Sequence, residues 1–237
     1  MPNILIAGIG SGGCQMISRL NDSGFTSGRL AVIDTDVVAL NSSSISTRLQ
    51  IGQAQTRGQG TGADINIGKA SATEDSESLA ALLQDVKLLI LVVGLGGGTG
   101  TGAAPVVAEI AHDMGIRTVA YATLPFEFEG SHCAQRANEG LVQLACSTDA
   151  TILLSLEEYA GSRENTSLVE AFKSVDAVLH EKLEAICAAM NELGLVGVDG
   201  VLKNEDVVKL PPETETDTKK SRFEKLLRFL RIKKRLK

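Results

Sequence analysis

Two stretches of the chain concentrate glycine where it could hold a ligand. GLGGGTGTG, residues 94–102, contains six glycines and two threonines, and GIGSGG, residues 8–13, contains four glycines. Each stretch follows an apolar run and precedes a helical pattern. Glycine permits unusual backbone angles, and the free N–H groups at a helix N-terminus favour anions. We call residues 8–13 the first glycine loop and residues 94–102 the second glycine loop. Together they predict a site where backbone N–H groups hold phosphate.

The first glycine loop alone leaves several functions open. Gly8-x-Gly10-x-x-Gly13 after an apolar run, with acids at Asp34 and Asp36, matches the fingerprint of dinucleotide-binding enzymes. It also suits a tight turn that packs a helix on a strand. The second glycine loop fits neither alternative, because a dinucleotide fold has no use for a second phosphate loop. It lacks the lysine of a P-loop, so backbone N–H groups and two hydroxyl groups would hold the phosphates.

The elements that would position these loops alternate along the chain. Apolar runs typical of strands buried on both faces cover residues 3–8, 30–35, 86–94, 116–124 and 150–156. Helical patterns cover residues 12–21, 74–84, 103–114, 130–146 and 167–192, and the last of these has an apolar stripe that should lie across the sheet. The alternation predicts an α/β fold, a three-layer sandwich with a mainly parallel sheet. Ligands bind such sheets at the carboxyl ends of the strands, where both glycine loops fall.

The composition indicates an aliphatic core in a reducing compartment. Of the 237 residues, 43% are apolar and only 3% are aromatic. Cys14, Cys133, Cys146 and Cys187 are scattered without a metal-binding spacing, so we expect thiols in a cytoplasmic protein. The N-terminal MPNILIAGIG lacks the features of a signal peptide, and no apolar run is long enough to span a membrane.

The charge divides the chain into an acidic body and a basic tail. Residues 219–237 hold ten basic residues and one acid, a net charge of +9, whereas the remainder carries −15. We expect residues 1–209 to form the folded domain, 210–221 a flexible linker and 222–237 a basic amphipathic helix. The apolar stripe of that helix contains Phe223, Leu226, Leu227, Phe229, Leu230, Ile232 and Leu236. Such a helix is typical of one that lies in the interface of an anionic membrane.

The tail has two other conceivable partners. It could dock on the acidic body of its own chain or of a neighbour. Nucleic acid is disfavoured, because the acidic body would repel the phosphate backbone and phosphate contacts need no apolar stripe.

The run GGGTGTG, residues 96–102, is a signature of the tubulin/FtsZ superfamily. AGIGSGG, DTDVVAL, TRGQGTGAD, GLGGGTGTGAAPVVAEIA, LPFEFEG and LVEAFKSVDAVL also occur in FtsZ order and spacing, up to about residue 206. The chain thus resembles the GTPase domain of an FtsZ-like protein. The resemblance implies an α/β sheet with GTP or GDP across the strand ends, Mg²⁺ on the phosphates and a long central helix.

The resemblance also implies roles for individual residues. Those expected around the phosphates are Gly10, Ser11, Gly12, Gly13, Cys14 and Gln15, then Gly62 and Ala63, then Gly96, Gly97, Gly98, Thr99, Gly100, Thr101 and Gly102. Glu129 stands where the family contacts ribose, Phe172 where it stacks on guanine, and Asp176 where it accepts the guanine N1–H and N2–H₂ bonds. A carboxylate accepts both donors, whereas adenine presents no such pair.

The sequence departs from the family at several positions. Cys133 stands where FtsZ has an arginine near the phosphates, Gln15 replaces an asparagine, and residues 156–158 (LEE) replace an Asn-Asp-Arg stretch. In FtsZ, acids in a loop after the central helix act on the neighbouring subunit's nucleotide, and a second domain follows. Here Glu205 and Asp206 are the candidate catalytic acids, at a shorter spacing, and we expect no second domain. This pattern resembles a truncated FtsZ-like group associated with membrane remodelling.

The sequence therefore predicts a cytoplasmic GTP-binding protein that lies peripherally at the inner face of a membrane. It would be a homo-oligomer or filament joined through the nucleotide face, with protein partners that the sequence does not specify and no nucleic acid. It would be either a GTPase, weak or dependent on self-association, or a nucleotide-gated scaffold that does not hydrolyse. A nicotinamide-dependent oxidoreductase would leave residues 96–102 without a role.

Overall fold

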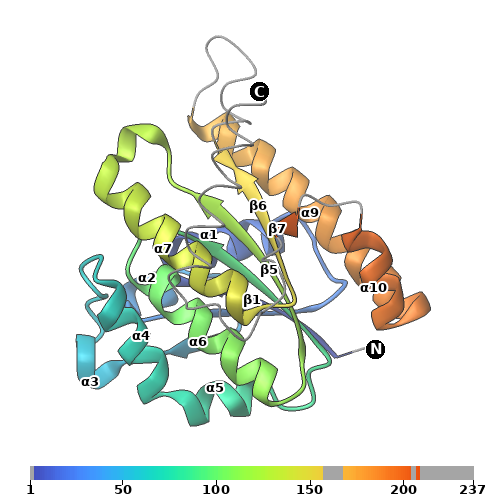
Figure 1. The fold of residues 1–237 in the computed structure, drawn as a ribbon, viewed down its shortest axis with the longest axis horizontal. Coiled ribbons are helices and arrows are strands. Elements are labelled where there is room, and N and C mark those ends of the chain that lie inside the picture. Colours follow the sequence, from blue (N-terminus) through green and yellow to red (C-terminus); the bar gives the residue numbers. More distant parts are fainter. Residues whose placement is uncertain (1–2, 157–167, 204–206, 209–237) are drawn as a thin grey trace, which may run out of the picture.

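The central feature of the fold is a seven-stranded sheet with the order β3-β2-β1-β4-β5-β6-β7 (Figure 1). The computed structural model describes residues 3–156, 168–203 and 207–208. The strands are β1 (Ile4–Ile9), β2 (Arg29–Asp34), β3 (Thr47–Gln50), β4 (Leu88–Gly94), β5 (Arg117–Leu124), β6 (Ala150–Ser155) and β7 (Val207–Val208). The first six run parallel, and β7 pairs antiparallel with β6. The expected α/β fold with a mainly parallel sheet is confirmed.

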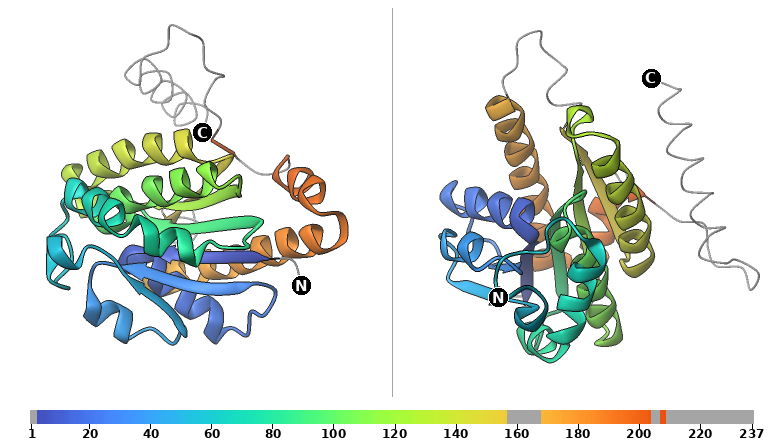
Figure 2. Two further views of the ribbon diagram at one scale, coloured as in Figure 1. Left: turned by 90° about the horizontal axis from the view of Figure 1, so that it is seen from below. Right: turned by 90° about the vertical axis from the view of Figure 1, so that its left-hand side faces the viewer.

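Helices cover both faces of this sheet and make the sandwich three layers thick (Figure 2). One face packs against α1 (Gly10–Asp22), α9 (Leu168–Leu193) and α10 (Leu195–Leu202), and the other against α4 (Ile65–Glu74), α5 (Ser76–Leu82), α6 (Thr99–Asp113) and α7 (Ser131–Ser147). The remaining described elements are α2 (Val37–Asn41), α3 (Gln53–Thr56) and the 3₁₀ turn η1 (Glu127–Glu129). Because successive side chains of a strand point to opposite faces, Ile4 and Ile6 join the cluster of α1 and α9, whereas Leu5 and Ala7 join that of α6.

Several element boundaries differ from the sequence expectation. The helix expected over 103–114 begins at Thr99, and that expected over 12–21 begins at Gly10, so part of each glycine loop is helical. The segment expected as one helix over 74–84 contains the end of α4 and all of α5, which meet at Asp75. Because glycine has a low helix propensity, the sequence pattern does not indicate that these glycine-rich segments begin helices. Tertiary packing stabilises the first turns there.

Two further expectations concern membranes and cysteines. Over residues 3–156, 168–203 and 207–208, no helix is long and apolar enough to cross a bilayer. All four cysteines lie in these ranges and form no disulfide. Three predictions lie outside the described residues: the acids Glu205 and Asp206, the linker over 210–221 and the amphipathic helix over 222–237.

Candidate functional site

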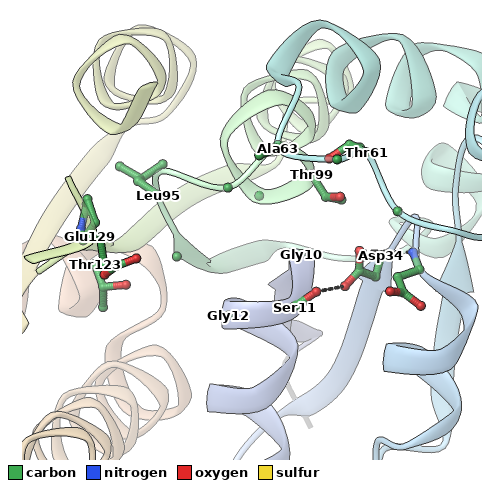
Figure 3. Close-up of a pocket in the computed structure, with 18 of the residues that line it drawn as sticks. Gly10, Ser11, Gly12, Asp34, Thr61, Ala63, Leu95, Thr99, Thr123 and Glu129 are labelled. Carbon is green, nitrogen blue, oxygen red and sulfur yellow. Dashed lines mark hydrogen bonds between the residues drawn. The ribbon is translucent and has the colours of Figure 1, made fainter. Parts of the chain in front are cut away.

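A pocket of about 440 Å³ lies at the carboxyl ends of β1, β2, β4 and β5. Figure 3 shows Ser11 and Asp34 on one side of this pocket and Thr61, Ala63 and Thr99 on the other. The lining consists of Gly10, Ser11, Gly12, Asp34, Asp36, Gln59, Gly60, Thr61, Gly62, Ala63, Gly94, Leu95, Gly97, Gly98, Thr99, Gly100, Thr123, Leu124, Pro125, Glu129, Leu156 and Phe172. Both glycine loops meet at the edge of the sheet where α/β proteins bind ligands.

The first glycine loop divides into residues that face the pocket and residues that face the core. Gly10, Ser11 and Gly12 line the pocket. Gly13 instead packs against β4, where a Cβ would collide with the carbonyl oxygen of Val92. The buried Cys14 thiol lies 3.5 Å from the carbonyl oxygens of Gly8 and Ile33, and burial raises its pKa to about 12.

The second glycine loop divides in the same way. Gly97, Gly98, Thr99 and Gly100 line the pocket, whereas Gly96, Thr101 and Gly102 do not. The hydroxyl group of Thr101 accepts a hydrogen bond from the Gly96 N–H at 2.9 Å, and a Cβ at Gly102 would collide with α4. The density of glycine therefore has two causes, access for a ligand and close packing of α6 on its neighbours.

The two glycine loops also pack directly against each other. A Cβ on Gly10 would lie 2.6 Å from the backbone nitrogen of Gly100, and one on Gly100 would lie 2.8 Å from the carbonyl oxygen of Gly94. A larger residue at Gly10 or Gly100 would separate the N-termini of α1 and α6. The paired helix N-termini together form a surface of backbone N–H groups suited to anions.

A third loop, residues 57–64, closes the pocket with an unusual backbone. Arg57, Gly58, Gly60, Gly62 and Ala63 all have positive φ angles, between 53° and 78°. Gly60, Thr61, Gly62 and Ala63 line the pocket, and the side chain of Asp64 then caps α4 by accepting the Asn66 N–H at 2.7 Å. Positive φ costs a residue with a Cβ about 1–2 kcal/mol, so tertiary contacts must hold Arg57 and Ala63 in this conformation.

Among the described residues that line the pocket, three are carboxylates and none is Lys, Arg or His. Asp34 accepts hydrogen bonds from the Ser11 hydroxyl at 3.0 Å and the Thr35 N–H at 2.7 Å, but burial raises its pKa above the ordinary value. Asp36 caps α2, and Glu129 accepts the Phe126 N–H at 2.8 Å. A phosphate group bound here would therefore meet backbone donors on one side and negative charge on the other.

The long helix α9 reaches this pocket with the side chain of Phe172, and Asp176 lies beside it. Phe172 lies in the lining, with 39% of its surface exposed. Its spacing in the sequence predicts a position on the apolar stripe of this helix, which faces the sheet. Asp176, one turn later, lies outside the lining and accepts hydrogen bonds from Arg19 Nε at 2.5 Å and Nη2 at 3.1 Å. The guanidinium carbon of Arg19 also lies 5.7 Å from the centre of the Phe172 ring.

The register of α9 is fixed by a regular series of polar contacts. Three pairs join it to α1 and the loop that follows, each four residues further along both segments: Arg19–Asp176, Ser23–His180 and Ser27–Glu184. The spacing matches one helical turn, so the series orients a single face of α9. As a consequence Phe172 faces the pocket, and Asp176 is held one turn further along the helix, outside the lining.

The remaining predicted residues stand outside the lining. Gln15 is exposed, and Cys133 lies on α7 with its thiol 3.8 Å from Glu129 Oε2. Burial is the main cause that raises the pKa of the Cys133 thiol, and the nearby Glu129 raises it further. In the described ranges, no group of three or more His, Cys, Asp or Glu side chains could hold a metal ion by itself.

Several lining residues were not expected from the sequence as site residues. Asp34 and Asp36 carried a signal, since they follow an apolar run at the carboxyl edge. Gln59 lies within the motif TRGQGTGAD and Leu156 begins the stretch LEE, whereas Thr123 carried no signal. Their positions depend on how neighbouring strands align, which single-sequence patterns do not record.

A parallel α/β sandwich with a glycine-lined pocket over two helix N-termini defines a nucleotide-binding fold. The chain belongs to the tubulin/FtsZ family: the model for "Tubulin/FtsZ family, GTPase domain" matches residues 3–161. The family resemblance of the sequence is thereby confirmed.

Curated relatives agree with this family. The cell division protein FtsZ of Aquifex aeolicus is 39% identical over 197 residues, 83% of this chain and 54% of that protein. The mitochondrial division protein fszA of Dictyostelium discoideum is 36% identical over 84% of this chain and 38% of that protein. The chain thus spans about half the length, or less, of these relatives.

Solved structures agree with the fold. An FtsZ dimer from M. jannaschii matches with a TM-score of 0.75 and 36% identity, over 81% of this chain and 56% of that one. CetZ2 from Haloferax volcanii, solved as a GTPγS-bound protofilament, matches with a TM-score of 0.70 over 81% of this chain and 60% of that one, at 24% identity. The second match supports the fold alone.

Proposed function

We propose that the chain binds GTP and GDP in the pocket between the two glycine loops. The observation that carries the proposal is the arrangement of two helix N-termini over one pocket, with Phe172 in its lining and a carboxylate one turn away. The phosphates would contact the backbone N–H groups of Ser11, Gly97 and Thr99, and guanine would stack on Phe172. Asp176 would accept the guanine N1–H and N2–H₂ bonds, sharing its oxygens with Arg19.

The charge of the pocket supports a requirement for Mg²⁺. Asp34 and Asp36 offer carboxylate oxygens, which Mg²⁺ prefers, but the described residues provide no complete metal site. Mg²⁺ is commonly held by one or two carboxylates together with the phosphates of the substrate. The ion would neutralise the phosphates beside the acidic lining, and these residues would orient the phosphates around it.

If the chain hydrolyses GTP, positioning and electrostatic stabilisation of the phosphates would supply the catalysis, without a covalent intermediate. Glu205 and Asp206, acting from a neighbouring subunit, are the candidates to position the attacking water. The alternative, a scaffold that binds GTP without hydrolysis, is supported by the shortened sequence around these two acids. Phosphate release at steady state and high protein concentration distinguishes the two.

Self-association through the nucleotide face is part of the same proposal. Phe128 is 69% exposed and stacks on Phe126 beside the lining residue Glu129, so an apolar side chain borders the pocket. Related proteins have been solved as an FtsZ dimer and as a CetZ2 protofilament. Sedimentation of the chain with GTP, with GDP and without nucleotide tests this part.

Attachment to a membrane is proposed from the sequence of the tail. The apolar stripe from Phe223 to Leu236 is flanked by basic residues, a pattern typical of helices in a membrane interface. Each basic residue near an anionic surface contributes about 1 kcal/mol, so the tail could bind without a partner. The chain would then act at the inner face of a membrane, in remodelling or in a process of the cell-division type.

The identity of the bound nucleotide is the most direct test of the whole proposal. The purified chain would be denatured, and the released nucleotide identified by chromatography. We expect GDP or GTP. Release of a nicotinamide dinucleotide would instead favour the oxidoreductase alternative.

A further inference from the structure

Over residues 3–156, 168–203 and 207–208, the lining of this pocket offers no cationic partner to the phosphates of a nucleotide. The ionisable residues in that part of the lining are Asp34, Asp36 and Glu129, all acidic. The arginine that the family has near the phosphates is replaced by Cys133, which carries no positive charge. A source of positive potential close to the second glycine loop would therefore change the affinity for anions substantially.

Arg136 stands one helical turn after Cys133, on the same face of α7. Its Nε donates a hydrogen bond to the carbonyl oxygen of Gly96 at 2.8 Å, and its side chain is half-buried. Cys133 borders the same glycine, since a Cβ at Gly96 would lie 2.5 Å from the Cys133 sulfur. Both α7 positions thus contact the start of the second glycine loop, and only Arg136 brings a charge.

The contact with Arg136 fixes the orientation of one peptide group. Gly96 has a φ of +108° and donates its N–H to Thr101 Oγ1, so the loop is held on that side as well. In a trans peptide the C=O of one residue and the N–H of the next point in opposite directions. Holding the Gly96 carbonyl toward α7 therefore turns the Gly97 N–H away from α7.

This arrangement leaves the N–H of Gly97 available to donate a hydrogen bond to a ligand in the pocket. It lines the pocket, and a Cβ added to it would meet no atom within 4 Å. A guanidinium group bonded to the Gly96 carbonyl also polarises the peptide and strengthens its N–H as a donor.

We propose that Arg136 is the positioning residue of the anion site. It orients the peptide between Gly96 and Gly97 toward the phosphates and supplies, from behind the loop, the positive charge that Cys133 lacks. This assignment rests on the proposed binding of nucleotide phosphates in the pocket.

The test compares ligands that differ only in their phosphates. The affinities of the full chain for GTP, GDP and guanosine would be measured with Mg²⁺, by displacement of a fluorescent GDP analogue, for the wild type, Arg136→Gln and Arg136→Lys. Arg29→Gln is the matched control, because Arg29 is exposed at the opposite end of β2. We expect Arg136→Gln to weaken GTP and GDP about tenfold or more while leaving guanosine unchanged. Arg136→Lys should weaken them less, since it keeps the charge.

Each other outcome overturns a distinct claim. If the wild type binds GTP and Arg136→Gln binds it equally well, or loses GTP and guanosine in the same proportion, the assignment of Arg136 is wrong. If the lysine variant loses as much as the glutamine variant, the role of the charge is wrong. Absence of guanine-nucleotide binding in the wild type would remove the proposed function, and this assignment with it.

Discussion

The carboxylate of Asp176 is held by the guanidinium group of Arg19, with Nε at 2.5 Å from Oδ2 and Nη2 at 3.1 Å from Oδ1. The pair joins α9 to α1 beside Phe172, and 17% of the Asp176 side chain is exposed. A carboxylate has lone pairs for more than two donors, so Asp176 can accept guanine while it stays bonded to Arg19. The contact with Arg19 orients the carboxylate that we propose binds guanine.

The first prediction is that Asp176→Ala removes the preference for GTP over ATP. Two charge-assisted hydrogen bonds to guanine would be lost, and the affinity for GTP should fall by about 1.5–3 kcal/mol or more, while that for ATP changes little. Equilibrium titration with both nucleotides measures the preference. Glu181→Ala, on the exposed side of the same helix, is the control. Equal binding of ATP and GTP by the wild type would contradict the role of Asp176.

The second prediction separates the two kinds of glycine in the second loop. Gly97→Ala puts a methyl group into open space within the pocket, so it should weaken GTP binding and change the free energy of unfolding by less than about 0.5 kcal/mol. Gly100→Val would collide with the backbone of β4 and β1, so it should lower the melting temperature even without ligand. Thermal unfolding with and without GTP checks both. Normal GTP affinity in the folded Gly97→Ala variant would argue against phosphate contacts at this position.

The third prediction concerns the buried Asp34. Its pKa is raised from the ordinary 3.8, chiefly by burial, so the folded state holds the proton more tightly than the unfolded state. The free energy of unfolding should therefore fall as pH rises from about 3.8 through the folded pKa, and remain lower above it.

Asp34→Asn should remove this contribution to the pH dependence. The amide can still accept from the Thr35 N–H and can donate to Ser11, so we expect no loss of stability at neutral pH. When Mg²⁺ is absent, removing a negative charge from the lining should also strengthen GTP binding, whereas with Mg²⁺ it should weaken binding, because Asp34 is a proposed oxygen donor to the ion. Denaturant unfolding between pH 4 and 8 gives the comparison, with the exposed Asp22→Asn as control. Equal GTP binding by the wild type and Asp34→Asn in the presence of Mg²⁺ would contradict the proposed contact between Asp34 and the ion.

The fourth prediction is that the tail carries membrane binding. The full chain should sediment with anionic liposomes, less so at high salt, and a chain that ends at Thr218 should stay in the supernatant. Leu226→Glu combined with Leu230→Glu should release the full chain, because both changes put charge on the apolar stripe. Ser221→Glu adds a charge outside that stripe and serves as control. If the chain that ends at Thr218 sedimented with liposomes as well as the full chain does, residues before the tail would carry the membrane binding.

The fifth prediction concerns hydrolysis between subunits. If Glu205 and Asp206 act on a neighbour's nucleotide, phosphate release per chain should increase with protein concentration. Glu205→Ala combined with Asp206→Ala should then abolish release without weakening GTP binding. A rate per chain that does not depend on concentration would indicate hydrolysis within one subunit, and no release at any concentration would favour the scaffold.

The sequence by itself determined the layers of the fold and the edge of the sheet that holds the pocket. The apolar runs around Ile6, Leu91 and Ala120 are continuous because strands buried on both faces exclude polar side chains. The glycine loops mark the carboxyl ends of β1 and β4, since a local backbone requirement leaves a local signal. Family membership follows from the same short motifs.

Only the tertiary structure decided which of these residues face the ligand. Gly13 and Gly102 pack helices against their neighbours, whereas Gly62 and Gly97 border open space, and nothing in their local sequence separates the two groups. The partner of Asp176 is 157 residues away, and Arg136 contacts a glycine 40 residues before it. Such contacts depend on how helices pack across the sheet, which the periodicity of one segment does not record.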